Sequence, residues 1–307
     1  MSTKRVRALS RAFSTALVTT LLVLSAAVPS VSAQSEELSV GTVTLQDDTE
    51  TVNIMLGDVS DLGSVQVDLY FDPTIIDVVA SSAGNIPGGG YSGGGPVDHG
   101  NYLSCSWSTT AEDGPSGSFT FFSVTFKPVS VGSDTFDFQN FVGSDTDGTE
   151  FTPAFNEGTY TVNPPTTVWV DDDWSGYSNG DDCGTQNGTP LTFGYNAFAD
   201  IQPGVNAVDD STVNVAAGSY SAFNITDDDI QVIGENGAIV DQDPIWEGGL
   251  IDHYLCGVLA DNVLVQNIEF DGSALDDCND SAAVFCPNTT GTTLSDLTIY
   301  DVNSTTC

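Results

Sequence analysis

The sequence predicts an all-β protein in which an antiparallel β-sandwich is followed by a solenoid of stacked strands. In the first half, Val65, Val67, Leu69 and Phe71 alternate with polar residues, as on a strand with one buried and one solvent-facing side. Strand-like runs recur there at short spacing, and no helical period competes with them. In the second half, 263–270 and 294–299 share an apolar-x-x-apolar-x-apolar pattern, which is typical of a solenoid.

The first half divides into strands separated by turn residues. The expected strands are 38–45, 51–56, 65–71, 102–107, 119–128, 135–138 and 159–162, with a short strand through Ile76 and Val78. Asp72-Pro73 ends the strand 65–71 because proline has no N–H to donate to the ladder. The glycine-rich run 88–95 is expected to be a mobile loop. Together these elements predict an antiparallel sandwich over residues 37–163.

The outward row of the strand 65–71 is a candidate partner-binding surface. Its members are Ser64, Gln66, Asp68 and Tyr70, since side chains two residues apart lie on the same face of a strand. An exposed tyrosine suits either a protein interface or stacking against a sugar.

The second half begins after a short linker, residues 164–167, and covers residues 168–307. Phe198, Ile201, Val205 and Val208 are spaced for one face of a short helix. Strand-like runs follow it, and the first of the weak repeats is 230–234. Because a strand pattern stands close to the last residue and no capping element follows it, we expect the solenoid to be incomplete at its C-terminal end.

The N-terminus resembles a secretory signal peptide over residues 1–33. A basic stretch with Lys4, Arg5, Arg7 and Arg11 precedes the apolar run 12–28, and Val31-Ser32-Ala33 is a small-residue cleavage site. The alternative is an uncleaved membrane anchor, since the apolar run approaches spanning length. The signal peptide predicts an extracellular, surface-associated protein without membrane insertion after its removal.

The charge is strongly acidic. The chain has 5 Lys and Arg against 43 Asp and Glu, and four of the five cations precede residue 33, so Lys127 is the one that remains. Such a surface repels nucleic acid, whose binding needs Lys and Arg. Salt screens the self-repulsion, so the composition indicates a salt-adapted, halophilic protein. The alternative, a disordered acidic tail, fits poorly because the acids are spread among aromatic and β-branched residues.

Several smaller patterns predict modifications and ions. Of the six cysteines, Cys278 and Cys286 are expected to form a disulfide because they are close in sequence. Four Asn-x-Ser/Thr sequons predict glycosylation at Asn187, Asn224, Asn288 and Asn303. Hard oxygen ligands for calcium cluster at Asp145 and Asp147 and at Asp171, Asp172 and Asp173. Zinc is not expected, since His99 and His253 are the only histidines.

Several segments of the first domain follow one family's pattern: 38–43, the strand 65–71 with its Asp72-Pro73 turn, 117–127, and the closing segments 145–149 and 156–162. With these segments the domain resembles a cohesin, the receptor half of the cohesin–dockerin pair. The resemblance implies a jelly-roll sandwich that docks a dockerin-like protein, or a carbohydrate as in related sandwiches. In dockerin-binding cohesins the outward row carries an Asn and an Asp, and this chain has Ser64 and Gln66 at those positions.

The second domain resembles a right-handed parallel β-helix of the pectin-lyase-like type, whose open end a short helix caps. The segments 197–208 and 211–220 carry this resemblance. Lyases of that family use an Arg or Lys base, and residues 168–307 contain neither. Aspartates are abundant, but nothing resembles the polygalacturonase pattern of paired Asp with a G-H-G, and neither histidine lies near a G-x-S-x-G, so we do not expect an enzyme.

Together these patterns predict a non-catalytic adhesion or scaffolding protein of an archaeal-style cell surface. The cohesin-like domain would bind a dockerin-like protein or a polysaccharide, and the β-helix would be a rigid, glycan-facing stalk. Two alternatives stay open: a fragment of a polysaccharide-active enzyme with catalytic coils beyond residue 307, and a self-assembling envelope protein.

Overall fold

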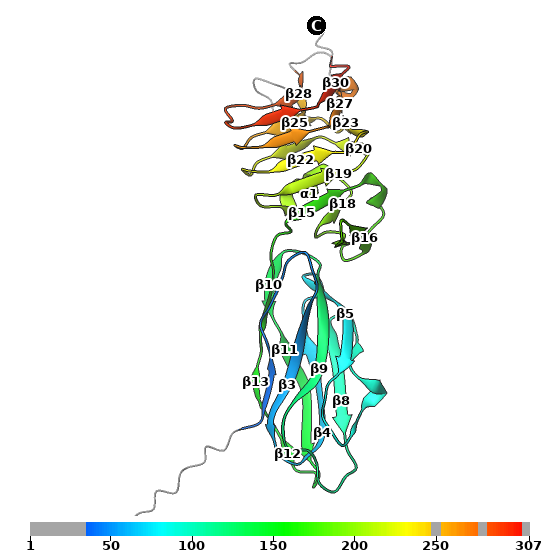
Figure 1. Cartoon of the computed structure of the whole chain (residues 1–307), viewed down its shortest axis with the longest axis vertical. Helices are drawn as coiled ribbons and strands as arrows, with labels where there is room; N and C mark the ends of the chain where they lie inside the picture. The colour runs from blue at the N-terminus through cyan, green and yellow to red at the C-terminus, as the bar shows by residue number, and fades with distance from the viewer. Residues whose placement is uncertain (1–34, 247–252, 276–280, 303–307) are drawn as a thin grey trace, which may run out of the picture. The chain divides into compact units, whose positions relative to one another are not determined.

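The computed structural model describes residues 35–246, 253–275 and 281–302 (Figure 1). The prediction of an all-β protein is confirmed, since nearly all regular elements of this part are strands. The predicted signal peptide 1–33 lies outside the described residues.

Two sheets form the sandwich. Their strand orders are β13-β1-β3-β9-β5 and β12-β11-β4-β8-β6, with β7 paired to β8, and a small third sheet has the order β10-β14-β2. The strands are β1 Glu37–Val40, β2 Val43–Leu45, β3 Glu50–Val59, β4 Leu62–Tyr70, β5 Ile76–Ala83, β6 Gly90–Tyr91, β7 Val97–Asp98, β8 Tyr102–Ser108, β9 Gly117–Pro128, β10 Gly132–Thr135, β11 Asp137–Asp145, β12 Glu150–Phe151, β13 Ala154–Asn156 and β14 Thr159–Val162. Most pairs are antiparallel as expected, but β1–β13 and β14–β2 are parallel.

Strand β4 has the orientation that its alternation predicts. Val67 and Leu69 are fully buried and Val65 is 1% exposed, in a core that they share with aromatic residues of β8 and β9. The backbone leaves the ladder at Asp72, whose Oδ1 accepts a hydrogen bond from the Thr74 N–H at 2.8 Å. This Asx turn encloses Pro73, which has no N–H to donate, and the strand ends where the sequence indicates.

Three local predictions in the sandwich were wrong. The segment 38–45 is two strands, β1 and β2, which belong to different sheets. Residues 135–138 do not form one strand, because β10 ends at Thr135 and β11 begins at Asp137. The glycine-rich run is not wholly a loop: Gly90 and Tyr91 pair with Ser108 and Trp107 of β8, and a 3-10 turn, η1 Ser92–Gly94, follows.

The second region contains three stacks of strands. Their orders are β18-β15-β19-β22-β26-β29, β20-β23-β27-β30 and β21-β25-β28, with β24 beside β25. The elements are β15 Thr167–Val170, η2 Asp172–Trp174, β16 Asp182–Gln186, β17 Thr189–Thr192, β18 Ala197–Phe198, α1 Ile201–Ala207, β19 Thr212–Val215, β20 Gly218–Ser221, β21 Phe223–Ile225, β22 Gln231–Gly234, β23 Ala238–Gln242, β24 Ile245–Trp246, β25 His253–Val258, β26 Leu264–Gln266, β27 Glu269–Asp271, η3 Gly272–Ala274, β28 Ser281–Phe285, β29 Thr293–Ser295 and β30 Thr298–Tyr300.

The sheets of this region are not all parallel. Within the stacks the neighbours pair in parallel, but β16–β17 and β24–β25 are antiparallel. A regular right-handed β-helix over the whole of 168–307 therefore stays an expectation. The predicted linker 164–167 overlaps the first strand, since β15 begins at Thr167.

In-register ladders build the core of the stacks. Val168, Val213, Val232, Val265 and Leu294 pair in turn across five strands. The four valines are fully buried, while Leu294, on the last described strand of its stack, is 43% exposed. Each inward residue is thus covered by the strand that follows it, as in a solenoid.

The short helix predicted from the 197–208 pattern is present as α1, and it packs against β15, β18, β19 and β21. It begins at Ile201 because the carboxylate of Asp200 accepts the Ile201 N–H at 2.8 Å. Gly204 allows the close approach, since a Cβ there would lie 2.9 Å from a methyl group of Val170. Ala197 and Phe198, which the pattern included, form strand β18 instead.

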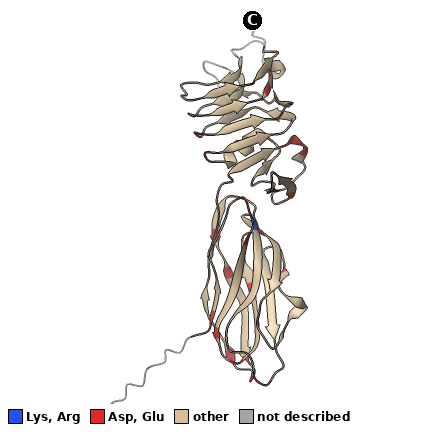
Figure 2. Cartoon of the chain, in the orientation of Figure 1, with Lys and Arg blue, Asp and Glu red and all other residues tan. Residues whose placement is uncertain are grey.

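Charges are distributed as the composition suggests. Figure 2 shows acidic residues on strands and loops of both regions. Lys127 forms an ion pair with Asp77 at 3.5 Å, and its ammonium donates to the carbonyl of Gly180 at 2.7 Å. Among the described residues no helix is long and apolar enough to cross a membrane.

Candidate functional site

The outward faces of β4 and β8 form one continuous surface. The pairing sets Ser64 opposite Ser108, Gln66 opposite Ser106, Asp68 opposite Ser104 and Tyr70 opposite Tyr102. Adjacent strands lie about 4.8 Å apart, so the outward side chains of β4 and β8 form two neighbouring rows. We call this surface the β4/β8 face. It contains the whole partner-binding row that the sequence predicted.

One end of the β4/β8 face is a groove of hydroxyl and amide groups. A hollow of about 580 Å³ is lined by Ser64, Gln66, Ser106 and Ser108, with Gly90, Tyr91 and Ser92 at one wall and Val142, which is 54% exposed, at another. None of the described residues that line it is acidic, although the chain has 43 Asp and Glu. The groove therefore suits an uncharged, hydrogen-bonding ligand segment.

The other end of the β4/β8 face is aromatic. The rings of Tyr70 and Tyr102 stack with centroids 4.8 Å apart and planes 19° apart, and His99 stacks on Tyr102 at 4.5 Å and 15°. Tyr70 is half-buried by this stack and so is less accessible than the sequence suggested. Desolvation, with smaller contributions from Asp68, Tyr102 and Asp137, raises the pKa of Tyr70 above 10.0.

Asp68 lies between the two ends and is the least accessible member of the row, with 7% of its surface exposed. Its Oδ2 accepts a hydrogen bond from Asn140 Nδ2 at 2.7 Å. Asn140 reaches it from a bulge in β11 between Gln139 and Val142, where its φ is 52°. Within the described part of the chain, the buried Oδ1 of Asp68 has no hydrogen-bond partner. Leaving a buried carboxylate oxygen without a donor is costly, and because this atom is not exposed, it cannot contact a ligand unless the surface around it rearranges.

Sequence reasoning missed much of this surface. The polar row of β8 was present as the alternation Tyr102, Ser104, Ser106, Ser108, and it could have been found from that period. His99 entered the sequence analysis only as an argument against zinc and against a catalytic triad, yet it extends the aromatic stack. Asn140 gave no local signal.

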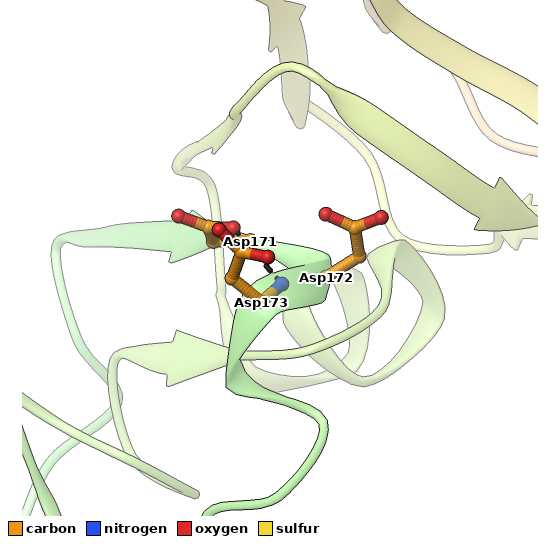
Figure 3. Close-up of side chains that lie close together, drawn as sticks. All are labelled: Asp171, Asp172 and Asp173. Atoms are coloured by element: carbon orange, nitrogen blue, oxygen red, sulfur yellow. Dashed lines mark hydrogen bonds between the residues drawn. The ribbon is translucent and has the colours of Figure 1, made fainter.

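Of the predicted calcium ligands, Asp171, Asp172 and Asp173 lie close together. The carboxylate oxygens of Asp171, Asp172 and Asp173 lie within 4.8 Å of one another, the only such group found in the described residues (Figure 3). Asp171 also accepts the Asp173 N–H, and Asp172 accepts the Ser219 N–H at 3.0 Å. Asp145 caps the β11–β12 turn by accepting the Thr149 N–H at 2.7 Å, and Asp147 is exposed beside it.

The predicted modification sites fall on different surroundings. Asn187 is exposed at the β16–β17 turn and Asn288 is exposed in a loop, whereas Asn224 is half-buried on β21. Asn303 lies outside the described residues.

Cys278 also lies outside the described residues, so its predicted disulfide with Cys286 stays a prediction. Burial raises the pKa of the Cys105 thiol to about 12, which makes that thiol a poor nucleophile.

Comparisons with known proteins concern the fold. No protein-family model matches the sequence, and the search of curated proteins gave no match. Among solved structures, the chain is similar to a non-cellulosomal cohesin from Archaeoglobus fulgidus, with 18% identity, 42% of this chain and 91% of that chain covered, and a TM-score of 0.37.

Two further cohesin structures from bacteria are similar to the same extent. One is in a type I cohesin–dockerin complex from Clostridium thermocellum, at 20% identity, 42% and 99% coverage and a TM-score of 0.37. The other is a type II cohesin from Acetivibrio cellulolyticus, at 16% identity, 42% and 91% coverage and a TM-score of 0.33. All three span less than half of this chain.

Proposed function

We propose that the chain is an extracellular adhesion or scaffolding protein whose sandwich docks a dockerin-like protein on the β4/β8 face. The observation that carries the proposal is the combination, on one face, of a hydroxyl-lined groove with an aromatic stack, on either side of the carboxylate of Asp68. Interfaces combine such rigid aromatic anchors with a few polar groups that fix orientation.

We propose that the second region is a parallel β-helix that serves as a rigid, non-catalytic stalk. Its in-register ladders make it stiff along the stacking direction, since each strand is held by two neighbours. Residues 168–307 contain no Lys or Arg, so a lyase-type base is missing from this segment.

A carbohydrate is the second candidate ligand of the β4/β8 face. The specific observation in its favour is the uncharged groove of Ser64, Gln66, Ser106 and Ser108 at one end of the face, with half-buried tyrosine rings at the other. Sugar hydroxyls both donate and accept, as these side chains do.

The test is a binding assay on the immobilised full chain. A panel of purified dockerin modules and a panel of neutral oligosaccharides are applied at low and at high salt. We expect saturable binding of a dockerin that is lost in Asp68→Asn, which keeps the side-chain shape but replaces an acceptor with a donor. Asn53→Ala, on the outer face of the other sheet, is the matched control and should bind normally.

Two outcomes would overturn the docking proposal. One is no saturable binding of any dockerin at either salt concentration. The other is unchanged dockerin binding in each of the single variants Asp68→Asn and Tyr102→Ala, when the thermal melting of each variant matches that of the parent chain. Saturable binding of an oligosaccharide, lost in the same variants, would establish the carbohydrate alternative instead.

A further inference from the structure

A second cleft, remote in sequence from the β4/β8 face, lies on the first strands of the stacked region. It has a volume of about 230 Å³ and is lined by outward residues of β15, β19 and β22, by η2 and by the turn of the β16–β17 hairpin. Its chemically distinctive members are Trp169, Trp174, Asp171, Asn214 and Glu235. We call it the tryptophan cleft.

The two indole rings are available to a ligand. Trp169 is on the outward row of β15, where it pairs with Asn214 of β19, and Trp174 ends η2. Both are half-buried. Neither ring stacks on another aromatic side chain within the described residues, unlike the tyrosines of the β4/β8 face. The π-faces therefore have no aromatic partner in the described part of the chain.

Negative charge at the tryptophan cleft has no counter-ion within its own region. Asp171 and Glu235 line the cleft, and the carboxylates of Asp172 and Asp173 lie within 4.8 Å of that of Asp171 (Figure 3). The sequence has no Lys or Arg after residue 127. A cation that enters the cleft would meet an attractive field from several carboxylates in a site partly shielded from water.

We propose that the tryptophan cleft binds an organic ammonium cation. Tryptophan is the aromatic side chain that attracts such cations most strongly, and carboxylates add to this attraction. A metal ion would not use the indoles, because calcium requires six to eight oxygen ligands. A neutral ligand would leave the carboxylates uncompensated. The same chemistry is offered by a free quaternary ammonium compound and by the lysine side chain of a partner protein.

The experiment titrates the full chain with choline and follows tryptophan fluorescence and heat. The matched control ligand is 3,3-dimethyl-1-butanol, which has the shape of choline without its charge, at the same ionic strength. We expect choline to saturate with a Kd on the order of 1 mM and the uncharged ligand to bind about tenfold more weakly. An arm with Nα-acetyl-lysine amide distinguishes the sources: tighter binding of choline indicates a free quaternary ammonium, and tighter binding of the lysine derivative indicates a partner's side chain.

Variants place the binding in the cleft. Trp174→Leu should weaken choline about tenfold, and Trp174→Phe, which keeps a ring, should fall between it and the parent. Glu235→Gln should weaken choline binding a few-fold and reduce its salt dependence, because it removes one carboxylate from the cleft. This carboxylate does not belong to the Asp171–Asp173 group. Trp246→Leu, at a tryptophan that is 71% exposed and outside the cleft, should change nothing.

Three results would overturn the proposal: no saturable response to choline, equal affinity for the uncharged ligand, or unchanged affinity in Trp174→Phe and Trp174→Leu variants whose melting curves match the parent. Because the cleft and the β4/β8 face share no residue, failure here leaves the docking proposal untouched, and the reverse also holds.

Discussion

The carboxylate of Asp68 on β4 is held by the side-chain amide of Asn140, which lies 72 residues later in a bulge of β11, at a distance of 2.7 Å. This contact covers Asp68 and leaves its second oxygen buried. The most polar member of the predicted partner-binding row is thus also its most enclosed one, and its position depends on a residue from another strand.

The Asp68–Asn140 pair should be measurable as a coupling energy. Removing one partner leaves the other buried and unpaired, so Asp68→Ala is expected to lower the free energy of unfolding by about 1–3 kcal/mol. In urea unfolding, the double variant with Asn140→Ala should lose less than the sum of the single variants by about 1 kcal/mol. Strict additivity would show that the two side chains do not interact in solution.

Alkaline pH should destabilise the fold through Tyr195. Burial, opposed in part by the hydrogen bond from the Asp47 N–H, raises the pKa of Tyr195 from 10.0 to about 12. Between these values the folded chain keeps a proton that the unfolded chain has lost, so stability is present below pH 10 and falls as pH rises toward 12.

Urea unfolding at a series of pH values from about 9 to 12 measures this effect. Tyr195→Phe should give a shallower fall, though not a flat one, because burial also raises the pKa of Tyr160 and Tyr220. Tyr177→Phe, at an exposed tyrosine, is the control and should keep the parental slope. An equal slope in the Tyr195→Phe variant would contradict the assignment.

Calcium is proposed as a second cation for Asp171, Asp172 and Asp173, in competition with the ammonium of the tryptophan cleft, because one carboxylate oxygen of each lies within 4.8 Å of the others. Added Ca²⁺ should then raise the free energy of unfolding by about 2.7 kcal/mol at 100 times its Kd. Asp173→Asn should remove the increase without changing the calcium-free stability, since the carboxylate of Asp173 is exposed. If Asp147→Asn removes it instead, the ion binds at the β11–β12 turn.

Salt adaptation is also open to measurement. With 43 acidic residues against 5 basic ones, repulsion between like charges should fall as NaCl screens it, most steeply up to about 1 M, where the Debye length is about 3 Å. Thermal melting is measured in NaCl and in sucrose at equal osmolality. Sucrose stabilises proteins because it is excluded from their surface, so any additional effect of NaCl reports the screening of charge. A melting temperature independent of NaCl would argue against a halophilic protein.

The stacked core should be sensitive to single deletions of volume. Val232 is fully buried in the ladder between Val213 and Val265, so Val232→Ala is expected to cost about 2 kcal/mol in urea unfolding. Gln231→Ala, at the adjacent exposed position, should cost less than about 0.5 kcal/mol. Equal effects at the two positions would be inconsistent with the inward ladder.

The sequence was informative wherever a structural feature is local. The alternation in β4, the Asp72-Pro73 stop and the spacing of Ile201 and Val205 on α1 each depend on a few neighbouring residues, and each was predicted correctly. The repeated patterns 263–270 and 294–299 likewise located strands, but each run is two short strands, β26 and β27 in the first and β29 and β30 in the second.

What the sequence did not indicate depends on contacts between distant segments. The burial of Asp68 comes from Asn140, and alternation alone assigned Asp68 to the solvent side. The assignment of β1 and β2 to different sheets follows from pairing with β3 and β14, which no local period encodes. The tryptophan cleft combines three strands, a 3-10 turn and the turn of a hairpin, and neither turn has a periodic pattern.

Lys127 has one more consequence. Trypsin cuts after lysine or arginine but does not cut a bond to proline, and the residue after Lys127 is Pro128. From residue 12 to residue 307 the chain therefore offers trypsin-like proteases no bond that they hydrolyse, folded or unfolded. The same property would hide it from peptide mass fingerprinting based on that enzyme, so a protease that cleaves beside acidic or aromatic residues is the reagent with which to detect it.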